Sequence, residues 1–148
     1  MGRTTLVAAL TVLLAGCGND RLAPIAAAPH QRAPSLAVAD PGEAVWHLRA
    51  GLNVAALSCR GRGRTGVAGG YGKVLNRHRS LLALAYAGEQ RRHGKGLDRH
   101  LTQLYNRFAY QPSPAKFCAN AAGVADEAAR MNSVTLSSQA RKLLGRLS

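Results

Sequence analysis

Three polar residues beside apolar helical faces are the best candidates for binding a ligand. His78 lies in the middle of an apolar face of helical spacing over residues 71–85, and Arg49 and Asn53 are one turn apart beside the apolar face of the preceding segment. Buried polar groups need partners, so we expect these side chains to meet, together with Tyr105. The arrangement predicts either a hydrogen-bonded cluster that fixes helix register or a small pocket in which Arg49 binds an anion.

The other residues capable of chemistry match no catalytic or metal-binding motif. The 7 Asp and Glu residues are scattered, and none forms a pair at a spacing that suggests a general acid and base. We interpret Glu43 as part of a helix cap and Glu89 as a helix-surface residue. His93 and His100 belong to no metal-ligand pattern, and we expect both to be exposed. The sequence therefore predicts a non-enzymatic protein with no cofactor and no metal site.

The first seventeen residues have the order of a bacterial export signal. Arg3 precedes an apolar run from Leu6 to Leu14, which is shorter than the about 20 residues that span a membrane. Small residues then lead to a cysteine in Leu14-Ala15-Gly16-Cys17. This pattern resembles the lipobox of bacterial lipoproteins, and an ordinary secretory signal is the alternative. The resemblance implies cleavage before Cys17, lipid on Cys17, and, because Gly18 rather than Asp follows, the periplasmic face of the outer membrane.

Lipid on Cys17 would leave two of the three cysteines, Cys59 and Cys118, to pair with each other in an exported protein. Their disulfide would close a loop of about 60 residues, for which the chain-entropy model gives about 4 kcal/mol. Two buried free thiols are the alternative. A zinc site is not expected, because the two residues lack the C-x-x-C spacing of zinc ligands.

Composition divides the chain into a signal peptide (1–16), a flexible Ala/Pro tether that carries the lipidated cysteine (17–39) and a helical domain (40–148). The domain begins at Asp40-Pro41-Gly42-Glu43, which has the cap residue, first-turn proline and glutamate of a helix start. The expected helices span about 41–60, 71–92, 97–110, 114–131 and 135 onward. No strand-like alternation occurs. The sequence predicts an all-α bundle of four or five helices.

Basic residues dominate the charge of the chain. The formal net charge is +13, and the run from Arg60 to Gly66 predicts an exposed basic loop that could contact an anionic polymer. Residues 66–73 depart from the phosphate-binding loop because Val67 replaces its first glycine. In an exported protein the charge favours anionic lipid or an envelope polymer over nucleic acid.

The stretch from Trp46 to Cys59, with Tyr105-Asn106 and Phe117-Cys118, is similar to small uncharacterised exported proteins of Gram-negative bacteria. This similarity implies no activity. We therefore expect a membrane-anchored envelope lipoprotein that binds or scaffolds an anionic polymer or another envelope protein. The alternative is a small periplasmic enzyme or ligand-binding domain that uses the cluster of Arg49, Asn53 and His78.

Overall fold

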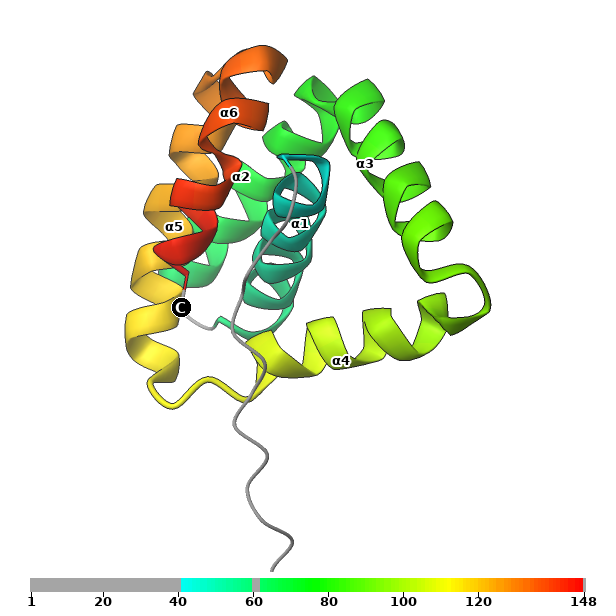
Figure 1. Cartoon of the computed structure of the whole chain (residues 1–148). Helices are drawn as coiled ribbons and strands as arrows, with labels where there is room; N and C mark the ends of the chain where they lie inside the picture. Colours follow the sequence, from blue (N-terminus) through cyan, green and yellow to red (C-terminus); the bar gives the residue numbers. More distant parts are fainter. Residues whose placement is uncertain (1–40, 60–61, 148) are drawn as a thin grey trace, which may run out of the picture. The chain divides into compact units, whose positions relative to one another are not determined.

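The computed structural model describes residues 41–59 and 62–147, and these residues are almost entirely helical (Figure 1). The elements are α1 (Pro41–Ser58), α2 (Arg62–Arg77), α3 (Arg79–His93), a 3-10 turn (Gly94–Gly96), α4 (Leu97–Ala109), α5 (Pro114–Arg130) and α6 (Ser133–Gly145). The expected small all-α bundle is confirmed. The expected signal peptide, Cys17, the tether and the Asp40 cap lie outside the described residues.

Helix α1 is the centre of the bundle. It packs against α2, α5 and α6 on one side and against α3 and α4 on the other (Figure 1). Its sequence is apolar around most of its circumference, which is typical of a helix buried on all sides. A Cβ atom added at Gly51 would lie 2.9 Å from Leu147 and 3.0 Å from Phe108. The absence of a side chain at Gly51 therefore lets α4 and the C-terminal residues approach α1 closely.

The segment expected as one helix over 71–92 forms two helices that meet at His78, and α2 begins inside the expected Arg-Gly loop. The loop prediction was wrong for residues 62–66. Glycine costs a helix about 1 kcal/mol relative to alanine, but the packing of α2 against α5 offsets this cost. A Cβ atom added at Gly70 would lie 2.9 Å from the Cβ atom of Ala125, so the two helices meet there almost backbone to backbone.

A disulfide joins Cys59, at the end of α1, to Cys118 in α5, with the two Cα atoms 5.5 Å apart. This is the expected pairing, and it ties the central helix to the helix that the sequence placed fourth. Among the described residues, no helix has both the length and the apolar character that crossing a membrane would require.

Candidate functional site

The structure does not assemble the expected cluster of Arg49, Asn53 and His78. The His78 ring is completely buried at the junction of α2 and α3, where Nδ1 lies 3.0 Å from Ser133 Oγ and Nε2 lies 3.0 Å from the carbonyl oxygen of Ala128. Both ring nitrogens are therefore occupied by α5 and the start of α6. His78 fixes the position of these helices and does not face a ligand pocket.

Arg49 forms the contact with Tyr105 that the sequence suggested. Its guanidinium donates a hydrogen bond to the Tyr105 hydroxyl and lies 4.9 Å from the centre of the Trp46 ring. Among the described residues, no hydrogen bond joins Asn53 to Arg49 or to His78. His78 therefore has a structural role, whereas Arg49 lies against the aromatic side chains of Trp46 and Tyr105.

A different cluster surrounds Glu89, whose side chain is 0% exposed near the end of α3. Its Oε2 atom lies 2.8 Å from Nε2 of His100, 3.5 Å from Nε2 of His93 and 3.9 Å from Nε2 of His47. Its Oε1 atom accepts a hydrogen bond from Arg92. The expectation that Glu89 lies on the helix surface was wrong. His93 and His100 are mostly buried as well, with side chains 28% and 20% exposed.

The ligand atoms of this cluster have no hydrogen-bond partner among the described residues. They are Nε2 of His47, His93 and His100 and Oε2 of Glu89, all of them buried. Although His100 Nε2 lies 2.8 Å from Oε2, the two atoms do not have the geometry of a hydrogen bond. Leaving a buried polar group without a partner costs about 1–3 kcal/mol. Several such atoms at one place would be satisfied together by one bound cation or by ordered water.

Three side chains of the cluster lie close enough together to share a metal ion after small rotations. The ligand atoms of His47, Glu89 and His100 all lie within 4.8 Å of one another. Metal–nitrogen and metal–oxygen bonds of 2.0–2.2 Å place neighbouring ligand atoms of a tetrahedral site about 3.3 Å apart. Side-chain rotations that shorten the longest of these separations by about 1.5 Å would bring the three atoms to this spacing. The expectation of no metal site stays a prediction, and this group of residues is able to hold an ion.

Burial keeps His47 in the form that binds metals. Desolvation lowers the pKa of His47 to about 4, with the positive charges of Arg107 and Arg92 acting in the same direction and Glu89 opposing them. Neutral imidazole is the form that donates a lone pair to a metal ion. At neutral pH, metal binding to His47 would therefore displace no proton from that ring.

The surrounding elements explain why these side chains meet. Glu43 and His47 are four residues apart on α1, with 3.9 Å between Oε1 and Nε2, and Glu89 and His93 have the same spacing on α3. The 3-10 turn, where Gly94 has a φ of +48° that favours glycine, then returns the chain so that His100 of α4 reaches Glu89. The His93 and His100 rings stack with centroids 3.6 Å apart. The repeated Glu-x-x-x-His spacing was the one feature of the sequence that could have indicated this cluster.

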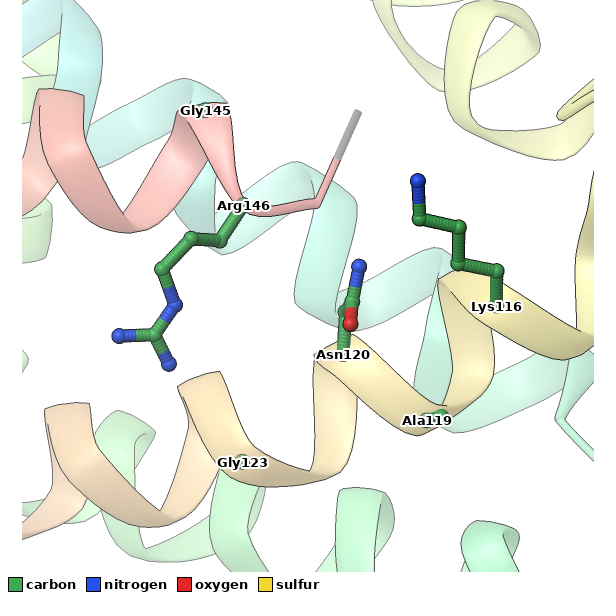
Figure 2. A pocket seen from close by; sticks show the side chains of 6 residues that line it. All are labelled: Lys116, Ala119, Asn120, Gly123, Gly145 and Arg146. Carbon is green, nitrogen blue, oxygen red and sulfur yellow. The ribbon is translucent and has the colours of Figure 1, made fainter.

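A pocket of about 370 Å³ lies apart from the cluster around Glu89, between α5 and the end of α6. It has basic side chains on both sides (Figure 2). Lys116 and Asn120 line it from α5, and Arg146 lines it from the end of α6. Arg146 pairs with Glu127 at 2.6 Å. Because that ion pair already neutralises the arginine, this pocket is a weaker candidate for a binding site than the cluster around Glu89.

Comparison of the chain with models of protein families, with curated proteins and with solved structures found no match.

Proposed function

We propose that this chain is an exported, lipid-anchored protein whose helical domain binds one transition-metal ion through His47, Glu89 and His100. The observation that carries the proposal is the buried group of ligand atoms without hydrogen-bond partners, three imidazole nitrogens and one carboxylate oxygen. Arg92 holds the other oxygen of Glu89, as residues behind a metal ligand commonly do, and so orients the first oxygen toward the imidazoles.

The donor set defines the class of metal. Two imidazoles and a carboxylate suit zinc and its neighbours in the first transition series, whereas calcium and magnesium prefer oxygen ligands alone. Three protein ligands would leave a coordination position for water or for an added ligand. His93 touches the same oxygen but stacks parallel to His100, so we assign it the role of holding the His100 ring in place.

The test of metal binding is titration of the chelator-treated, disulfide-intact protein with Zn²⁺ by calorimetry and with Co²⁺ by absorption spectroscopy. We expect one ion per chain and the intense visible bands of a four-coordinate cobalt site. His100→Gln and Glu89→Gln should each weaken binding at least tenfold, and Glu127→Gln should bind like the unaltered protein because that residue is exposed and pairs with Arg146.

Two results would contradict the metal proposal. One is a stoichiometry well below one ion per chain in the folded protein, as judged by its helical circular dichroism. The other is unchanged affinity in His100→Gln. This variant provides the safer comparison, because the His100 side chain is partly exposed whereas Glu89 is fully buried and its replacement could impair folding.

The anchor is supported by the sequence pattern around Cys17 and by the disulfide. Disulfides persist in exported proteins and are rare in reducing compartments. The net charge of +13 would favour contact with anionic lipid or polymer in the envelope. We expect Cys17→Ser to abolish labelling by radioactive fatty acid and to release the protein from membranes. A variant that is still labelled and still sediments with membranes would refute the anchor without affecting the metal proposal.

A further inference from the structure

A groove beside Arg49 has no role in the metal proposal. It has a volume of about 310 Å³ and is lined by α1, by the end of α2 and by α3. Its aromatic walls are Trp46 and Tyr86, whose ring centroids are 4.8 Å apart, and Leu75 and Leu82 add apolar surface. Arg49 and Arg79 supply its charges. The groove therefore combines an apolar, partly aromatic wall with two cations.

Arg49 is a half-buried cation without an anionic partner. The Trp46 ring and the Tyr105 hydroxyl hold its guanidinium, and among the described residues no carboxylate forms an ion pair with it. Removing a charge from water is costly unless an opposite charge compensates. The aromatic ring offsets part of this cost through cation–π attraction, but neither the ring nor the hydroxyl carries a negative charge. A bound anion would supply the missing compensation.

Arg79 adds a second cation to the lining of the groove. It is the first residue of α3, whose first turn contains no acidic residue, and no ion pair involves it among the described residues. The C-terminal end of α2 lies one residue before the N-terminal end of α3, so the opposite partial charges of the two helix ends offset each other. The positive charge that is added to that of Arg49 therefore comes from the Arg79 side chain.

We propose that this groove binds a small amphipathic anion, a carboxylate on a planar apolar body. The carboxylate would pair with Arg49 and Arg79, because guanidinium groups bind carboxylates through charge-assisted and often bidentate hydrogen bonds. The apolar body would lie against Trp46, Tyr86 and Leu75. This site is separate from the group of His47, Glu89 and His100, so neither proposal depends on the other.

The groove contains its own reporter, because Trp46 is the single tryptophan of the chain. The test compares benzoate with benzamide, which has the same shape without the charge, and with inorganic phosphate, which has charge without the apolar body. Trp46 fluorescence is followed in chelator-treated protein, so that no metal ion can bind the carboxylate. We expect a saturable change with benzoate at a concentration at least tenfold lower than with benzamide or phosphate.

Two variants on α3 locate the site. Arg79→Gln should weaken benzoate binding about tenfold, the effect of losing one charge-assisted hydrogen bond, with an unchanged melting temperature. Arg91→Gln changes an exposed arginine of the same helix that does not line the groove, and it should bind like the unaltered protein. Equal binding of benzoate and benzamide, equal binding of benzoate and phosphate, or full benzoate affinity in Arg79→Gln would each overturn the proposal.

Discussion

Acidification should destabilise the metal-free protein in part through protonation of His47. Burial lowers the pKa of His47 to about 4 in the folded chain, compared with 6.5 for the unperturbed group. The unfolded chain therefore binds a proton at His47 more readily than the folded chain does. The stabilising contribution of neutral His47 is complete above pH 6.5 and is lost as the pH falls from 6.5 to about 4.

The magnitude follows from the difference between the two pKa values. Each tenfold difference in proton affinity corresponds to about 1.4 kcal/mol, so a pKa lowered from 6.5 to about 4 amounts to up to about 3 kcal/mol. This is a large fraction of the 5–15 kcal/mol typical of a whole domain. Within that pH window, the free energy of unfolding should change by at most about 1.4 kcal/mol per pH unit because of this one group.

The assay is urea unfolding at several pH values between 7.5 and 4 in the presence of a chelator, for the unaltered protein and for His47→Gln. The comparison concerns the slopes and not the absolute stabilities, because the replacement also alters packing. The slope is that of the free energy of unfolding plotted against pH. We expect it to be lower in the variant, because unfolding of the variant no longer takes up the proton that His47 binds. Parallel pH dependences of the two proteins, or a nuclear magnetic resonance titration of His47 with a midpoint near 6.5, would refute the reasoning.

Three other predictions concern the packing that surrounds the sites. Gly70→Ala should destabilise the fold by about 1–3 kcal/mol, because its methyl group would lie 2.9 Å from a side chain of α5. Gly69→Ala meets nothing within 4 Å and should stabilise the fold by about 0.5–1 kcal/mol. Equal urea midpoints of the two variants would contradict this packing. Reducing the disulfide between Cys59 and Cys118 should lower the free energy of unfolding by up to about 4 kcal/mol, measured by thermal melting with and without reductant. An unchanged melting temperature would argue against the disulfide. His78→Ala should lower the free energy of unfolding, measured with urea, by about 1–3 kcal/mol while leaving the zinc affinity of the folded protein unchanged, and lost zinc binding would contradict its structural role.

Much of the helical framework could be predicted from the sequence. Proline at the first position of a helix predicted the starts at Pro41 and Pro114, and Gly94 marked the end of α3. The apolar circumference of the helix expected over about 41–60 is typical of a central helix, and the expectation of export led to the predicted pairing of Cys59 with Cys118. These features depend on local backbone preferences, on hydrophobic periodicity and on covalent chemistry, all of which can be evaluated from residues close together in the chain or from residue type alone.

The cluster around Glu89 depended on tertiary structure. Glu-x-x-x-His spacing is equally compatible with a solvated helix face, where i,i+4 pairs are common, and so it did not distinguish an exposed Glu89 from a buried one. Burial arises because α1 covers one side of Glu89 and the turn at Gly94 returns His100 of α4 to the other. The same principle separated His78 from Arg49, because His78 lies 29 places further along the chain and can face any neighbour once the intervening chain turns. Side chains acquire buried partners from segments distant in sequence, and only the packing of those segments decides which atoms meet.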